Sequence, residues 1–115
     1  GDLKRAVLGT DSAQYKILLS HDPSHWDAEV NSLFPDIDLT LSGHTHAFQF
    51  AVERGNIKWS PASLLFKQWG GLYEKVHGNG MIQYLYVNRG LGTLGYPGRI
   101  ATRPEITLII LHKLD

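Results

Sequence analysis

Two histidines stand one residue apart in LTLSGHTHAFQF, residues 39–50, and a third directly follows YKILLS, residues 15–20. Imidazole is the commonest neutral protein ligand of borderline metals such as zinc. Because His44 and His46 follow a glycine, a tight turn can direct their rings toward two separate points. This spacing suits two metal ions about 3.5–4 Å apart, and it suits equally a turn whose histidines face water. His21 would add a third imidazole.

A helix over residues 22–34 is predicted between the two stretches that carry these histidines. Asp22 suits the capping position and Pro23 the first helical position. Apolar residues then recur at i, i+4, i+7 and i+8, which predicts that one helix face packs inward. These apolar residues are Trp26, Val30, Leu33 and Phe34.

Two strands are predicted on either side of this helix, a buried one over residues 15–20 and another over residues 37–42. Strands joined by a helical crossover lie parallel in one sheet. Their carboxyl ends therefore meet at one edge, and we expect His21 and His44 to lie near each other there. The unit is β-α-β, and the fold class is α/β.

The rest of the chain has patterns typical of antiparallel strands. A hairpin is predicted around HGNG, residues 77–80, because Asn-Gly supplies the positive φ angles of a tight turn. The other predictions are strands over residues 48–53 and 105–113, a helical turn over residues 64–68, and hairpin arms over residues 72–76 and 81–88.

Composition limits the function classes that remain. The chain has 115 residues, of which 43% are hydrophobic, and we expect residues 1–115 to form one domain. Its 11 basic and 11 acidic side chains balance, so no charge excess indicates a nucleic-acid partner. Cysteine is absent, which excludes thiolate metal sites. The start lacks Met and a signal peptide, and we expect the chain to be part of a longer protein. The compartment stays unknown.

Two motifs together resemble a known family. LLSHDP followed by LTLSGHTH is similar to the last two motifs of the calcineurin-like metallophosphoesterases, and the similarity continues through WGGLYE and LYVNRGLGTLGYPGRIATRPEITLI. The downstream part resembles the branch with bacterial, often membrane-anchored, phosphoesterases. The resemblance covers residues 16–113. It implies the C-terminal half of an α/β/β/α sandwich and hydrolysis of a phosphomonoester or phosphodiester substrate.

The resemblance also implies residue roles. His21 and His44 would bind one divalent ion and His46 a second, the ions being Mn, Fe or Zn. The family's Asp-x-His, bridging Gly-Asp and catalytic Gly-Asn-His motifs have no counterpart here, because Gly1-Asp2 lacks a following Gly-Asn-His. Three neutral imidazoles cannot offset four positive charges, so this chain alone should bind at most one ion weakly and turn over negligibly. No residue of this chain is therefore predicted to be catalytic.

Two alternatives stay open. One is a catalytically silent module that self-associates as a homo-oligomer or domain-swapped dimer, because half of a sandwich exposes sheet edges and apolar faces. The other is a mononuclear zinc hydrolase with three histidine ligands and an open position.

The glycine-rich stretch RGLGTLGYPGR, residues 89–99, contains G-x-G-x-x-G. A dinucleotide-binding loop would have to open a helix, and Tyr96-Pro97-Gly98 prevents one. A turn-rich loop at the rim of the site is the better interpretation. Asn88 and Arg89 are then predicted to contact a substrate phosphate, because guanidinium groups suit phosphate oxygens. For Arg89, a structural ion pair is the simpler alternative.

Overall fold

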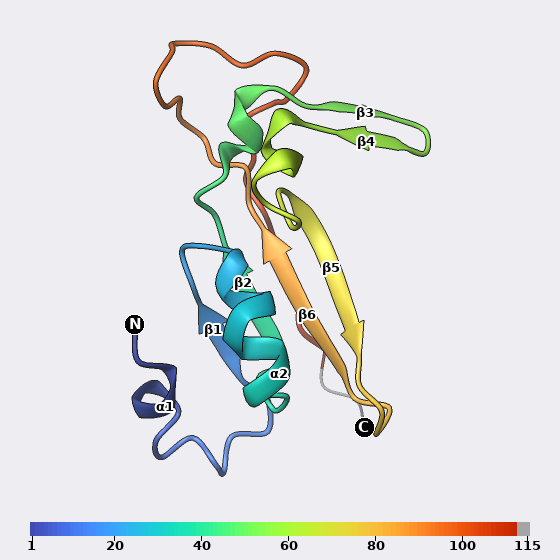
Figure 1. Ribbon diagram of the computed structural model, residues 1–115. Helices are drawn as coiled ribbons and strands as arrows, with labels where there is room; N and C mark the ends of the chain where they lie inside the picture. Colours follow the sequence, from blue (N-terminus) through green and yellow to red (C-terminus); the bar gives the residue numbers. More distant parts are fainter. Residues whose placement is uncertain (113–115) are drawn as a thin grey trace.

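The computed structural model describes residues 1–112, and Figure 1 shows its helices and strands. Six strands and five short helical segments follow one another in the described residues. In chain order these are α1 (Leu3–Ala6), β1 (Ile17–Leu19), the π-helix η1 (Trp26–Val30), α2 (Asn31–Leu33), β2 (Leu39–Ser42), the 3₁₀ segment η2 (His46–Gln49), β3 (Val52–Arg54), β4 (Ile57–Trp59), the 3₁₀ helix η3 (Pro61–Leu64), β5 (Gly71–Val76) and β6 (Ile82–Val87).

A four-stranded sheet with the order β1-β2-β6-β5 organises the lower part of Figure 1. β1 pairs with β2 in parallel, and β2 also pairs with β6 in parallel. β5 and β6 form an antiparallel hairpin. The predicted β-α-β unit followed by antiparallel strands is therefore confirmed, and the mixed α/β sheet is compatible with the C-terminal half of a metallophosphoesterase sandwich.

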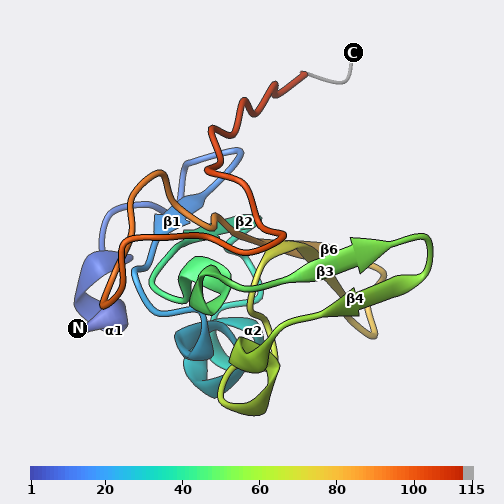
Figure 2. The same ribbon diagram turned by 90° about the horizontal axis from the view of Figure 1, so that it is seen from above.

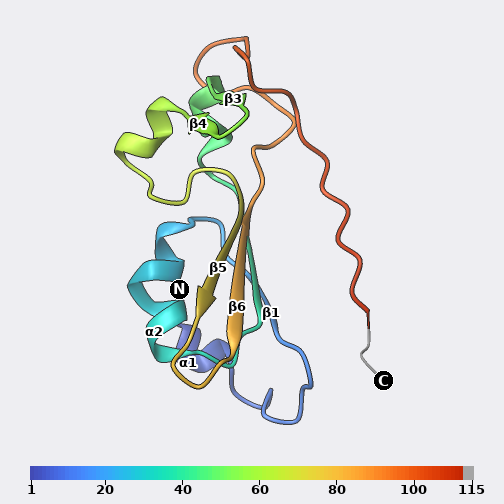
Figure 3. The ribbon, with the colours of Figure 1, turned by 90° about the vertical axis from the view of Figure 1, so that its right-hand side faces the viewer.

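One face of this sheet packs against the helical segments, as the side view in Figure 3 shows. Leu85 and Val87 of β6 contact Trp26 and Val30 of η1 in the main buried cluster. The predicted inward helix face is correct for Trp26 and Val30. It is wrong for Leu33, which is 61% exposed because the segment changes from π to α geometry at Asn31 and turns this residue outward.

The opposite face of the sheet is open. Leu19 in β1 is 78% exposed and Leu72 in β5 is 60% exposed. Register places Leu19, Leu41, Tyr86 and Leu72 in one row across the four strands. The prediction that residues 15–20 form a buried strand is therefore wrong. β1 is an edge strand with only Leu18 directed at the helices.

The β5–β6 hairpin forms as predicted, with Gly80 at φ 82° in its turn. A second hairpin of β3 and β4 projects sideways above the sheet, as the view from above in Figure 2 shows. Only residues 52–53 of the predicted 48–53 strand are in β3. Residues 48–49 belong to η2, and Phe50 forms an isolated parallel bridge with Ile100. The predicted helical turn lies earlier, at Pro61–Leu64.

The prediction of a strand over residues 105–113 is wrong for its described part, since no strand is assigned to residues 105–112; residue 113 lies outside the described residues. This apolar segment is extended, and Figure 3 shows it on the side of the sheet opposite the helices. Its backbone makes one ladder-like bond, from Glu105 N to Gly90 O at 3.0 Å. A strand needs a partner strand, and none lies beside it within residues 1–112. None of the described helices has the length and apolar character needed to cross a bilayer.

Candidate functional site

His21 and His44 lie together at the carboxyl ends of two parallel strands. His21 Nε2 and His44 Nδ1 are 3.0 Å apart, and the two rings meet edge to face with centroids 4.8 Å apart. Both side chains are exposed. Two nitrogen ligands of one tetrahedral zinc ion lie about 3.3–3.4 Å apart, so this separation is close to that of two ligands sharing an ion.

The backbone explains why the two rings meet. Ser20 N donates to Leu41 O at 2.9 Å, and Gly43 N donates to His21 O at 3.1 Å, so the parallel pairing continues past β1 and β2. His44 then leaves the strand with φ 64°, a left-handed conformation that turns its side chain toward His21. Asp22 follows His21, and both imidazoles contribute to lowering the pKa of its carboxyl, although a hydrogen bond from Ser24 is the largest cause.

His46 begins an unusual turn. Every residue from His46 to Gln49 has a positive φ, between 48° and 58°, and none of them is glycine. A left-handed conformation costs an L-residue about 1–2 kcal/mol because Cβ approaches the following carbonyl oxygen. Such strain persists only where the surroundings hold the backbone in place, and it gathers at functional sites.

Two buried hydroxyl groups hold this left-handed turn. Thr45 Oγ1 donates to Trp69 O at 2.7 Å and accepts from Ala47 N at 3.2 Å. Ser60 Oγ donates to Ala47 O at 2.7 Å and accepts from Ala62 N at 3.1 Å. Ala47 itself has no exposed surface. The orientation of His46 is therefore set by contacts from the β4–β5 connection.

The His46 ring is partly buried between this turn and the glycine-rich loop. Its Nδ1 atom is buried and has no hydrogen-bond partner. Burial lowers the pKa of His46, and the positive charge of Arg99 and the neighbouring His44 and His21 lower it further. A neutral imidazole with an unshared lone pair suits a metal ligand.

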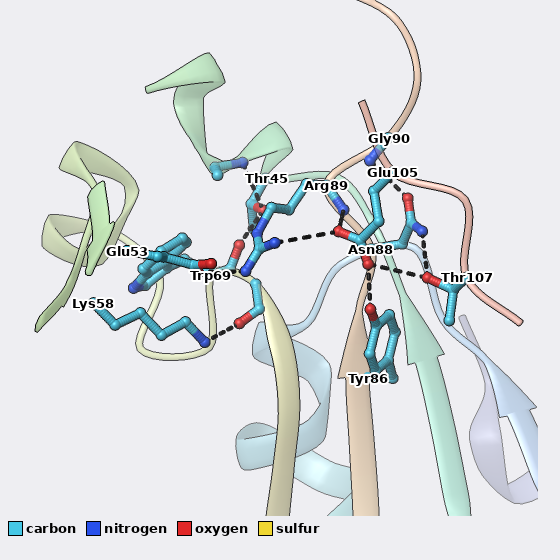
Figure 4. A network of polar contacts seen from close by, with 12 residues as sticks. Thr45, Glu53, Lys58, Trp69, Tyr86, Asn88, Arg89, Gly90, Glu105 and Thr107 are labelled. Atoms are coloured by element: carbon cyan, nitrogen blue, oxygen red, sulfur yellow. Dashed lines mark hydrogen bonds and ion pairs between the residues drawn. The ribbon is translucent and has the colours of Figure 1, made fainter. Parts of the chain in front are cut away.

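Asn88 and Arg89 lie in a polar network at the end of β6, drawn in Figure 4. Arg89 forms ion pairs with Glu53 of β3 and with Glu105, the latter at 3.6 Å, and its guanidinium lies 5.8 Å from the Trp69 ring centroid. Lys58 lies 4.9 Å from the same centroid and donates to Gly70 O. Arg89 thus links the β3–β4 hairpin to the sheet.

Glu105 is the acceptor at the centre of this network. It accepts hydrogen bonds from the Tyr86 hydroxyl, from Arg89 N at 3.2 Å and from Thr107 Oγ1 at 3.0 Å. Burial acts to raise the pKa of Glu105, but these hydrogen bonds outweigh it and lower the pKa below its ordinary value. Burial and the Glu105 contact raise the pKa of Tyr86. These contacts fasten residues 105–107 beside the end of β6.

Sequence reasoning missed several residues around His46. Arg99 Nη2 donates to the carbonyl oxygens of Arg89, Gly90 and Gly92 at 2.9, 3.0 and 2.6 Å, so it holds the glycine-rich loop. The hydroxyl groups of Thr45 and Ser60 hold the left-handed turn of residues 46–49 by hydrogen bonds to Ala47. Their sequence neighbourhoods contain no motif, and only the tertiary contacts indicate these roles. For Arg99, the only indication in the sequence is that it ends the glycine-rich stretch whose carbonyl oxygens it binds.

The donor set fits a divalent ion in part. His21 and His44 form a preorganised pair, and His46 adds a partly buried imidazole whose Nδ1 has no hydrogen-bond partner. Within residues 1–112, however, no three His, Cys, Asp or Glu side chains are grouped closely enough to hold one ion. Neutral imidazoles alone leave the charge of the ion uncompensated.

An apolar cavity of about 330 Å³ opens beside the histidines. Phe66 stacks edge to face with both His44 and Phe48, at centroid distances of 5.5 and 6.3 Å. A ligand that reached His44 and His46 would therefore lie next to aromatic side chains. The lining residues are His44, Thr45, His46, Phe48, Gln49, Phe66, Leu94 and Tyr96.

Comparison with curated proteins identifies relatives along almost the whole chain. A transmembrane protein with metallophosphoesterase domain from Danio rerio is 39% identical over 112 residues, or 97% of this chain, and its Bos taurus namesake is 36% identical over 111 residues, or 96%. An uncharacterized metallophosphoesterase, YkuE, from Bacillus subtilis is 37% identical over 106 residues, or 88%. The chain belongs to the calcineurin-like metallophosphoesterase family. The resemblance to this family is thereby confirmed.

This metallophosphoesterase chain spans 23% of the length of the Danio rerio and Bos taurus relatives and 32% of YkuE. No family model matches the chain, and no solved structure matches it.

Proposed function

We propose that the protein containing residues 1–115 hydrolyses a phosphomonoester or phosphodiester with divalent ions, and that this chain is the C-terminal half of its catalytic domain. His21 and His44 bind one ion and His46 binds the second. The observation that carries this proposal is the 3.0 Å approach of His21 Nε2 and His44 Nδ1 at the carboxyl ends of parallel strands. The relatives named metallophosphoesterases support the reaction class.

The side chains of this chain have simple roles in the proposal. Bound Mn, Fe or Zn ions would polarise the phosphoryl oxygens of the substrate and supply positive charge to the transition state. His21 Nε2 and His44 Nδ1, 3.0 Å apart, would both bind one ion in place of their mutual contact. His46 offers a neutral imidazole held by the left-handed turn. Phe66 and Phe48 exclude water from one side of the site.

This chain by itself is expected to bind one ion weakly and to have negligible activity. Its three imidazoles carry no negative charge, and phosphoester hydrolysis is among the slowest uncatalysed reactions. Groups that bridge two ions at a fixed spacing are usually carboxylates. Asp22 lies near the histidine pair, but its carboxylate accepts a hydrogen bond from Ser24 N at 2.9 Å.

Asn88 and Arg89 remain predicted contacts of the substrate phosphate. A phosphate at Arg89 would compete with Glu53 and Glu105 for the guanidinium. Arg89→Lys keeps the charge but loses the planar fork. In the active full-length protein we expect this variant to raise KM more than it lowers kcat. An unchanged KM would leave Arg89 with a structural role alone.

Metal titration tests the ligand assignment. We expect Co²⁺ added to this chain to give a visible d–d absorption that Zn²⁺ removes, with His21→Ala and His44→Ala each weakening binding at least tenfold. His77→Ala is the matched control, because His77 lies at the β5–β6 turn and its ring nitrogen Nε2 lies 3.4 Å from Gln83 Oε1. Equal Co²⁺ binding by wild type, His21→Ala and His44→Ala would contradict the proposal.

Turnover separates the proposal from a mononuclear zinc hydrolase. Bis(p-nitrophenyl) phosphate suits the aromatic lining of the cavity. We expect no turnover above buffer by this Zn²⁺-loaded chain. Turnover that His46→Ala abolishes would instead favour three histidines around one zinc ion with an open position.

We also propose that this chain alone self-associates, as a homo-oligomer or by exchange of strands. Exposed Leu19 and Leu72 on the open face of the sheet support this, as does the unpaired segment with Ile106 85% exposed. Exposed apolar faces and unpaired strands of this kind favour association with another chain. Size-exclusion chromatography with light scattering should give a mass above 12.9 kDa. A stable monomer would contradict self-association.

Membrane association of the complete protein is a further proposal. It rests on the two relatives named transmembrane proteins. Fractionation of cells that express the full-length protein should place it with the membranes, and release by salt alone would oppose a spanning anchor.

A further inference from the structure

Gly90 lies against the ring of His46. A Cβ atom at Gly90 would be 3.2 Å from His46 Cε1 and 3.3 Å from His46 Nδ1. These separations are tighter than ordinary contacts to a Cβ atom, so a side chain at position 90 would press on the imidazole. Gly90 also has φ +75°, which L-residues rarely adopt.

Both the N–H and the carbonyl oxygen of Gly90 are hydrogen-bonded. Its N–H donates to Asn88 Oδ1 at 2.6 Å. Its carbonyl oxygen accepts from Arg99 Nη2 and from Glu105 N, each at 3.0 Å. Asn88 is itself fixed, because its Nδ2 donates to Thr107 Oγ1 at 2.9 Å. Figure 4 shows how Asn88, Gly90 and Thr107 connect.

The ring of His46 has no hydrogen bond that would fix its orientation: its Nδ1 is buried without a partner, and neither ring nitrogen bonds to any other described residue. In metal sites of proteins, the second nitrogen of a histidine ligand usually donates to an oxygen acceptor that sets the ring orientation. Steric contact with a rigid backbone can do the same task. Gly90 is the backbone that lies there.

We infer that Gly90 is a positioning residue for His46. Held by Asn88 and Arg99, it sets the rotation of the imidazole by contact, and in this way it replaces the usual hydrogen-bonded support of a metal ligand. The inference rests on the proposed function for its meaning, since His46 is there the ligand of the second ion. The contact itself does not depend on any metal.

The first experiment therefore uses the metal-free chain. In wild type we expect a nuclear Overhauser effect between His46 Hε1 and the Gly90 α protons. Gly90→Ala should shift the His46 imidazole resonances, while those of His77 stay unchanged. Gly92→Ala is the matched control, because a Cβ at Gly92 meets nothing within 4 Å and its φ is not in the left-handed region. Unchanged His46 resonances in Gly90→Ala would overturn the inference.

A second variant separates ring contact from backbone strain. Asn tolerates the left-handed region much better than Ala, yet it carries a Cβ. If contact with the ring matters, Gly90→Asn displaces the His46 resonances as Gly90→Ala does. If Gly90 serves only the conformation of the loop, Gly90→Asn restores the wild-type His46 spectrum, and the inference fails.

A zinc titration, followed through the same resonances, connects the contact to the proposed function. We expect Gly90→Ala to raise the Zn²⁺ concentration for the half-maximal His46 shift at least tenfold, the size typical of lost support for a metal ligand, and to leave the His44 response unchanged. Equal His46 responses in wild type and Gly90→Ala would overturn the positioning role. If Zn²⁺ never perturbs His46 in wild type, the ligand assignment fails, whereas the metal-free spectra still decide the contact.

Discussion

The sheet and the loop region above it are held together in different ways. The sheet packs its helical face through apolar side chains, and Val30, Leu85 and Val87 there have no exposed surface. The loop region of residues 45–70 and 88–107 has a smaller apolar cluster, and polar side chains that reach backbone groups fasten it in addition, such as Ser60 to Ala47 O and Arg99 to Gly90 O. Apolar burial has no preferred direction, whereas hydrogen bonds require a particular alignment of donor and acceptor. Hydrogen bonds from side chains to the backbone are therefore used where the orientation of the His46 ring must be fixed.

The proposed metal ligands divide between these two regions. His21 and His44 follow the ends of β1 and β2, and the pairing of these strands together with the left-handed conformation of His44 brings the two rings together. His46 belongs to the loop region and depends on the left-handed turn and on Gly90. Disturbing the loop region should therefore move His46 and spare the His21–His44 pair.

The largest expected effect comes from the apolar core of the sheet. Leu85→Ala removes a fully buried side chain next to Trp26 and should lower the free energy of unfolding by about 2–5 kcal/mol. Urea unfolding, followed by fluorescence, measures this. Leu72→Ala on the open face is the control and should change stability by at most about 0.5 kcal/mol. Equal losses in both variants would break the distinction between the two faces.

Arg89→Met tests the polar support of the loop region. It leaves Glu105 and Glu53 without their cation and should cost about 1–3 kcal/mol, because Glu105 is largely buried. We expect the indole signal of Trp69 to shift and that of Trp26 to stay, since only Trp69 contacts Arg89. Lys67→Ala breaks an exposed ion pair with Asp27 and should cost about 0–1 kcal/mol. A large shift of the Trp26 indole signal in Arg89→Met would show that the sheet and the loop region do not respond independently.

Acid should loosen the loop region through Glu105. Its pKa is lower in the folded chain than its ordinary value of 4.5, so the ionised carboxylate adds stability that is fully present above that value. This stability is lost as pH falls through the folded pKa. We expect the stability difference between wild type and Glu105→Gln to shrink as pH falls from about 6 to about 3. Glu74→Gln, at an exposed site, controls for the loss of one carboxylate.

Ser60→Ala removes one buried hydroxyl that holds the left-handed turn. Ala47 O would lose its donor and Ala62 N its acceptor, which should cost about 1 kcal/mol. We expect the His46 resonances to shift and those of His21 to remain. Ser32→Ala, whose exposed hydroxyl bonds Glu29 O at 3.3 Å, is the control. An unchanged His46 would mean that Ser60 does not hold the turn.

The smallest effect is expected for Ala47→Gly. Glycine relieves about 1 kcal/mol of left-handed strain and loses a similar amount of buried methyl surface, so the net change should be within about 0.5 kcal/mol. Ala62→Gly removes an equally buried methyl at a residue without positive φ, and it should cost about 1 kcal/mol or more. Equal losses at both positions would contradict strain at Ala47.

Sequence patterns were sufficient for the β-α-β unit and the Asn79-Gly80 hairpin, because the residue pattern indicates each element and the type of connection fixes the direction of the paired strands. They failed for residues 105–112, where the apolar alternation is typical of a strand but the described residues offer no strand to pair with. They failed also for the turn after His46. A left-handed run is normally indicated by glycine, and Ala47 and Phe48 stand there instead.

The sequence by itself determined the family, the parallel unit and the edge at which His21 and His44 lie, since periodicity indicates the elements and a helical crossover fixes the direction of the two strands. Only the tertiary structure decided the orientation of His46 and the ion pairs of Arg89 with Glu53 and Glu105. These depend on groups far apart in the chain, such as Thr45 with Trp69 and Arg89 with Glu53. No spacing rule encodes such contacts, because their geometry exists only after the chain has closed around them.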